Sequence, residues 1–128
     1  MSSSLNLPPD FFDVSIIHKS YKFYVLLHEV VGKFPKRERH SMGQSCEQTA
    51  LGLLKLLFRA NSVYGRERLV LLTEVDTDLK VLKTFIRLAF DIQAINDRQY
   101  LNLQTSLQEI GKMLGGWIKQ TKEETSVL

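Results

Sequence analysis

The sequence predicts an all-α protein folded as an up-down-up-down antiparallel four-helix bundle. Three observations support this prediction. Apolar residues recur every three or four positions along most of the chain, which is the period of one face of a helix. No proline occurs between residues 36 and 128, so nothing interrupts long helices there. No Asn-Gly or Asp-Gly turn separates alternating apolar runs, so the signals for β-hairpins are weak.

The first two predicted helices flank a basic connector. One helix is expected over residues 11–33, with Asp10 or Asp13 as its N-cap. It ends before Pro35, because a proline disfavours helix in the residue that precedes it. Basic residues follow the proline, and a second helix is expected over residues 40–60 with Cys46 on its apolar stripe.

The third helix is expected over residues 66–92, and the fourth begins after Asn96. Asn96 is a suitable N-cap, and Gln99 is placed to complete a capping box. The apolar positions from Tyr100 to Trp117 alternate steps of three and four, which indicates a narrow seam like that of a coiled coil. Short connections make successive helices antiparallel. The predicted organisation is a disordered tail at 1–9, one bundle domain at 10–122 and a disordered tail at 123–128.

Length and composition limit the protein class. A chain of 128 residues forms about one domain, and 44% apolar residues suffice for a core. The net charge of +3 permits a polyanionic partner without requiring one. A single cysteine, Cys46, excludes an internal disulfide framework and suits a reducing compartment. Without a membrane-length apolar run or a signal peptide, we expect a soluble, cytoplasmic protein with no membrane partner.

The motifs that would indicate an enzyme or a metal site are missing from the sequence. There is no phosphate-binding glycine loop, no Gly-x-Ser-x-Gly elbow and no Glu-x-x-His pair. The adjacent residues His28 and Glu29 project from different faces of a helix. We therefore expect His28 to be semi-buried beside a hydroxyl and Cys46 to be a core residue. The prediction is a non-enzyme with no metal and no cofactor.

Three glycines near the end of the fourth helix require an explanation. Each glycine in a helix interior costs about 1 kcal/mol relative to alanine. Gly111, Gly115 and Gly116 fall within six residues, and Trp117 then continues the apolar seam. We interpret these four residues as a site of close packing between helices or between subunits. Fraying of the helix near its C-terminus is the alternative.

Three clusters of basic residues are candidates for binding phosphate groups. The first lies on one face of the third helix, where no acidic residue occurs between Asp78 and Asp91, so we expect its charge to be uncompensated locally. The second consists of the basic residues in the connector after Pro35, and the third consists of the basic residues on either side of Glu67. Each cluster alone is also compatible with an ordinary solvated face. The candidate binding residues are Lys80, Lys83, Arg87, Lys36, Arg37 and Arg39.

Three segments carry a resemblance to a known family. They are Phe34-Pro35-Lys36-Arg37, the third-helix segment LKVLKTFIRL at 79–88, and EIGKMLGGWI at 109–118. In this order and spacing, they resemble the accessory variability determinant of diversity-generating retroelements. The wider group includes four-helix proteins encoded by intervening sequences in large ribosomal RNA genes. The resemblance covers roughly residues 18–120.

The resemblance implies a fold, an assembly and partners. Members of this family are four-helix bundles that assemble into barrel-shaped homopentamers. The accessory determinant binds the reverse transcriptase of its retroelement, and nucleic acid, through a basic surface. It supports synthesis of mutagenized complementary DNA and is not a catalyst. Lys83 and Arg87 match family positions that bind the reverse transcriptase. At the first of them, lysine stands where the family usually has arginine, and lysine keeps the charge but cannot form the bidentate hydrogen bonds of arginine.

A second hypothesis gives the same fold a different role. The protein would then be a self-associating structural protein of the intervening-sequence type, with no reverse-transcriptase partner. A nearby reverse-transcriptase gene with template and variable repeats would favour the first hypothesis. A position within a ribosomal RNA gene would favour the second.

Overall fold

The computed structural model describes residues 11–127 and the side chains of residues 15–126. The predicted tail at residues 1–9 lies outside the described residues. Within them, the structure is helical and contains no strand. The elements are α1 (Phe11–Gly32), α2 (Lys36–Glu38), the π-helix η2 (Arg39–Gly43), α3 (Gln44–Asn61), α4 (Gly65–Asp91) and α5 (Asp97–Val127). The predicted all-α class is therefore confirmed.

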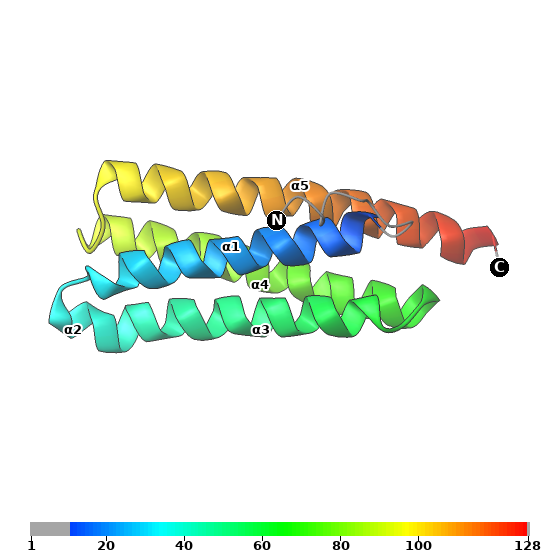
Figure 1. Cartoon of the computed structure of the whole chain (residues 1–128), viewed down its shortest axis with the longest axis horizontal. Helices are drawn as coiled ribbons and strands as arrows, with labels where there is room; N and C mark the ends of the chain where they lie inside the picture. Colours follow the sequence, from blue (N-terminus) through cyan, green and yellow to red (C-terminus); the bar gives the residue numbers. More distant parts are fainter. Residues whose placement is uncertain (1–10, 128) are drawn as a thin grey trace, which may run out of the picture.

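The four long helices form an antiparallel bundle (Figure 1). α1 packs against α3 and α5, and α4 packs against the same two helices. α1 and α4 therefore lie on one diagonal of the bundle, and α3 and α5 on the other. The connection between α1 and α3 lies at the same end of the bundle as the turn between α4 and α5 (Figure 1).

The core consists of the apolar stripe that each long helix turns inward. Leu27, Leu57, Leu82 and Leu107, one from each helix, are at most 1% exposed. Burying such a side chain contributes about 1.5–3 kcal/mol to folding. The seam predicted for the last helix is buried from its second member onward, since Leu103, Leu107, Ile110, Leu114 and Trp117 are all core residues. Tyr100, its first member, is half-buried.

The connection between α1 and α3 is more helical than the sequence predicts. Helical structure resumes directly after Pro35, as the single turn α2, and η2 follows before α3 begins at Gln44. Gly43, the last residue of η2, is buried against α1. A Cβ atom there would lie 2.7 Å from Val31 Cγ1. The missing side chain of Gly43 therefore allows η2 to pack closely on α1.

The turn between α4 and α5 contains the predicted capping box. The backbone N–H of Gln99 donates to Asn96 Oδ1 at 2.8 Å, and the backbone N–H of Asn96 donates to Gln99 Oε1 at 2.9 Å. These reciprocal bonds satisfy two donors near the start of α5. Gln93, in the same turn, has a φ of 64°, a left-handed conformation that is costly for a residue with a side chain.

α5 continues to Val127, so residues 123–127, assigned to a tail from the sequence, are helical. Thr121 is fully buried, and its hydroxyl donates to the carbonyl of Trp117 at 2.8 Å. The inward face of α5 thus extends beyond the last apolar residue of the seam. No described helix combines the length and the apolar character needed to cross a membrane.

Candidate functional site

The cation row of α4, which consists of Lys80, Lys83 and Arg87, is the main candidate site. Lys80 and Arg87 are exposed, and Lys83 is half-buried. The row lies on the side of α4 that faces α5. Gln104 of α5 donates its side-chain N–H to the carbonyl of Lys83 at 3.2 Å. A Cβ atom on Gly111 of α5 would lie 3.8 Å from Lys83 Nζ, so the lysine ammonium lies beside α5.

The outer two cations of the row are compensated, contrary to the prediction from the sequence. Lys80 Nζ lies 3.1 Å from Asp76 Oδ2, and Arg87 Nε donates to Asp91 Oδ1 at 3.1 Å. Both acids lie one helical turn beyond the row, where residues four apart share a face. Between these pairs, Lys83 has no carboxylate partner among the described residues.

The electrostatic environment differs between the two sides of α4. On the α5 side, the Tyr100 hydroxyl and then the Asp91 carboxylate raise the pKa of Arg87, so its charge is secure. On the α3 side, burial and then Glu74 raise the pKa of the Asp78 carboxyl. Asp78 is half-buried, and its Oδ2 would lie 3.9 Å from a Cβ atom on Gly52 of α3.

The connector cations form a separate site. Lys36, Arg37 and Arg39 are all exposed. Arg37 Nε lies 3.8 Å from Glu38 Oε1, and Arg39 donates to the carbonyl of Phe34 at 3.4 Å. The connector joins α1 to α3. The cation row lies on α4, the helix diagonal to α1, and faces α5. The two predicted sets therefore share one end of the bundle but lie on different sides of it.

The predicted packing residues of α5 have different environments within the chain. Gly111 faces α4, and a Cβ atom there would lie 3.4 Å from Leu79 Cδ2. Gly115 is exposed, and a Cβ atom there would meet nothing within 4 Å. Gly116 is half-buried, and Trp117 is buried. An added Cβ atom would make only an ordinary contact at Gly111 and none at Gly115, so close packing within the chain does not account for either glycine.

Arg68 has a structural position that the sequence pattern did not indicate. Its Nε donates to the carbonyl of Ala60 at 2.9 Å, and so satisfies an acceptor near the C-terminus of α3. Its guanidinium carbon lies 5.2 Å from the centre of the Tyr64 ring and 5.3 Å from that of Trp117. These are cation–π distances. Arg68 therefore joins three elements of the bundle and is not part of a solvated basic cluster.

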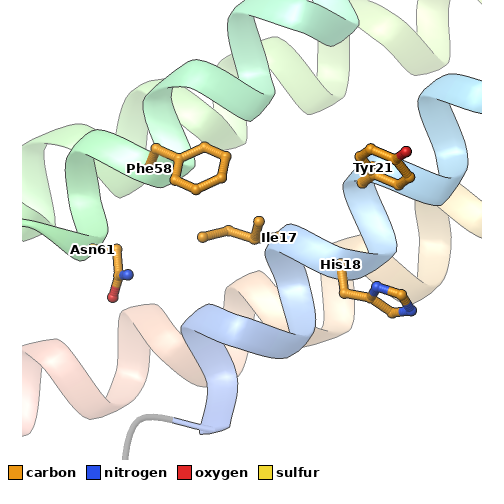
Figure 2. A pocket seen from close by; sticks show the side chains of 5 residues that line it. All are labelled: Ile17, His18, Tyr21, Phe58 and Asn61. Atoms are coloured by element: carbon orange, nitrogen blue, oxygen red, sulfur yellow. The ribbon is translucent and has the colours of Figure 1, made fainter. Parts of the chain in front are cut away.

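An apolar groove between α1 and α3 was also missed from the sequence. It has a volume of about 460 Å³ and is lined by Ile17, His18, Tyr21, Phe58 and Asn61 (Figure 2). Tyr21 and Phe58 are 60% and 56% exposed, which is high for aromatic side chains. Exposed apolar surface of this kind often marks a contact with another molecule.

Several titratable side chains lie between α1 and α3, where His28 is exposed and not semi-buried as predicted. His28 Nδ1 lies 3.0 Å from Glu47 Oε2, and the Tyr24 hydroxyl donates to Glu47 Oε1 at 3.5 Å. Burial and then Glu47 raise the pKa of the Cys46 thiol to about 11. Among the side chains that the structure describes, no three His, Cys, Asp or Glu residues gather in a way that could hold a metal ion.

Comparisons with known proteins add a family match. Residues 14–121, most of the chain, match the model of the family described as bAvd-like. A search of curated proteins found no significant match. The matched range contains all four long helices in large part, together with the cation row and the connector.

Proposed function

The chain belongs to the bAvd-like family of all-helical accessory proteins, and on that premise we propose that it is the non-catalytic accessory protein of a diversity-generating retroelement. In this role it binds the reverse transcriptase of the same element, and template RNA or complementary DNA, through basic surfaces. By holding enzyme and nucleic acid together, it supports mutagenic synthesis of complementary DNA.

The cation row of α4 is the observation that carries this proposal. The row is rigid, because it projects from the middle and end of a helix of 27 residues that packs on two neighbours. Lys83 is held against α5 and has no described carboxylate partner, so its ammonium is available to an anionic group of another molecule. A partner carboxylate or phosphate would form a charge-assisted hydrogen bond there.

Self-association is the second part of the proposal. We infer that the chain assembles into a homopentamer, in which the apolar groove between α1 and α3 is covered by a neighbouring copy. The exposed Tyr21 and Phe58 support this, because aromatic residues are enriched at subunit contacts. Since one chain carries a net charge of +3, five copies would carry +15. Binding of nucleic acid would then weaken steeply with added salt.

A non-catalytic role agrees with the environments of the reactive groups. Cys46 is buried and its thiol pKa is raised to about 11, so it is a poor nucleophile at neutral pH. His28 and Glu47 form a contact between two helices of the bundle. The proposal therefore assigns binding and positioning to this protein and leaves nucleotide transfer to the reverse transcriptase.

Charge reversal in the cation row tests the proposed function. The Lys83→Glu/Arg87→Glu variant is expected to lose co-purification with the reverse transcriptase and to keep its helical content and mass. The matched control is Lys55→Glu/Arg59→Glu, which reverses two exposed cations of α3. A double variant of α4 that still binds fully would contradict the assignment. Equal loss in the α3 control would show that only net charge matters.

A further inference from the structure

A single line of five charged side chains runs along α4. It begins with Asp76, passes through the cation row and ends with Asp91, at steps of three or four residues. It covers about 22 Å of helix at 1.5 Å per residue. The outer cations contact the acids at 3.1 Å in both cases. The pattern along the helix is therefore negative, three times positive, then negative.

These two acids affect binding more than folding. Both ion pairs are exposed, with side-chain exposures between 41% and 75%, and pairs of that kind contribute little to stability. Each carboxylate occupies donors of the cation beside it and repels an approaching phosphate. On this face, Lys83 is the one cation of the row without an acid partner among the described residues. A nucleic-acid backbone that approached Lys83 would also meet a carboxylate on either side of it.

We propose that Asp76 and Asp91 make this face of α4 selective for a protein partner over a free nucleic-acid backbone. The partner surface would have an acidic centre opposite the cation row and a cation opposite each aspartate. Nucleic acid cannot meet this pattern, because its backbone charge has one sign throughout. Juxtaposed like charges suppress wrong partners, and complementary charges fix the register of the right one. The inference rests on the proposed function and assigns this face to the reverse transcriptase.

The Asp76→Asn/Asp91→Asn variant tests the inference. The probe is a fluorescently labelled single-stranded oligouridine, titrated with the full chain at several salt concentrations. Each freed cation can add one phosphate contact, which changes the slope of log K against log salt by about 0.7 for a single strand. Two added contacts change this slope by about 1.4. The ratio of variant to wild-type affinity for the RNA is then expected to change by up to about 25-fold when the salt concentration changes tenfold. The variant is expected to bind the RNA more tightly and with the steeper slope.

A matched control separates the position of the charges from their number. Glu67→Gln/Glu74→Gln also removes two exposed negative charges from α4, beside the groove that α4 forms with α3. RNA affinity that is unchanged in the aspartate variant, or equally raised in the control, would overturn the inference. The aspartate variant is also expected to bind the reverse transcriptase several-fold more weakly, and equal or tighter binding would overturn the proposed pattern.

The proposed function and this inference can fail separately. If the wild-type protein does not bind the reverse transcriptase at all, the proposed function fails. The RNA titration then still decides whether the two aspartates exclude a nucleic-acid backbone from α4. A melting curve of each variant verifies that the bundle is intact, which is expected because all four substituted residues are at least partly exposed.

Discussion

Replacing Gly43 by alanine is expected to destabilise the protein, because the new methyl group would collide with α1. The Cβ atom would lie 2.7 Å from Val31 Cγ1 and 3.4 Å from both the carbonyl of Glu38 and Phe34 Cδ2. Carbon atoms are most stable about 3.5–4.0 Å apart, so the two elements must separate by about 1 Å. The backbone itself accepts alanine, since Gly43 has helical angles of −61° and −44°.

The magnitude follows from two opposing effects. Overpacking a well-packed site costs about 1–3 kcal/mol. Alanine in place of glycine at a helical position recovers up to about 1 kcal/mol. The expected net loss is therefore about 1 kcal/mol of unfolding free energy. In a Val31→Ala background the collision disappears, so Gly43→Ala is expected to become neutral or slightly stabilising.

Urea unfolding of the four proteins in this double-mutant cycle, followed by circular dichroism, measures the effect. The coupling energy between positions 31 and 43 is expected to be about 1–3 kcal/mol. Gly111→Ala is a control, because its Cβ would make an ordinary contact at 3.4 Å with the end of the flexible Leu79 side chain. The reasoning would be refuted if Gly43→Ala stabilised the protein, or had the same effect in both backgrounds.

Three further predictions concern single residues. Gln93→Gly is expected to stabilise the protein by up to about 1 kcal/mol, because glycine accepts the φ of 64° without strain; a lower melting temperature would contradict this. Gly115→Ala is expected to stabilise the monomer by about 1 kcal/mol, since alanine favours a helix more than glycine and the new Cβ would meet open space. A destabilised monomer would show that position 115 does not face open space. Cys46, with its pKa raised from 9.0 to about 11, is expected to react far more slowly with a thiol reagent at pH 8 in the native than in the unfolded protein. The thiol of Cys46 loses its proton at a lower pH in the unfolded chain, so the unfolding free energy should fall as pH rises from about 9 to about 11. A native thiol that reacts quickly, with stability that does not fall over this range, would contradict the burial of Cys46.

The bundle could be predicted from the sequence because its signals are local and repeated. The three- and four-residue spacing of apolar side chains defines the inward face of each helix. Pro35 and the pair Asn96 and Gln99 mark boundaries through backbone chemistry that depends on neighbouring residues alone. The π-helix η2 has no such signal. Its last residue, Gly43, packs closely on Val31 of α1, and a contact between different elements cannot be seen in the local sequence.

The candidate site was predicted only in part. The cation row was visible as a helical face, but the pairing of its two outer cations was missed because Asp76 and Asp91 lie just outside the row. The spacing of four residues that joins each acid to its cation was present in the sequence. The role of Arg68 could be read in this way only for Tyr64, four residues before it, because the carbonyl of Ala60 and the ring of Trp117 belong to α3 and α5.

The central claim is that this protein is the partner of a reverse transcriptase. Co-purification of the tagged protein with the reverse transcriptase encoded at its own locus, at moderate and at high salt, tests this claim most directly. The account predicts a stable complex at moderate salt that weakens as salt rises, because the contact depends on the exposed cations of α4. A well-folded protein that forms no complex at either salt concentration would contradict it and would favour the intervening-sequence type of four-helix protein.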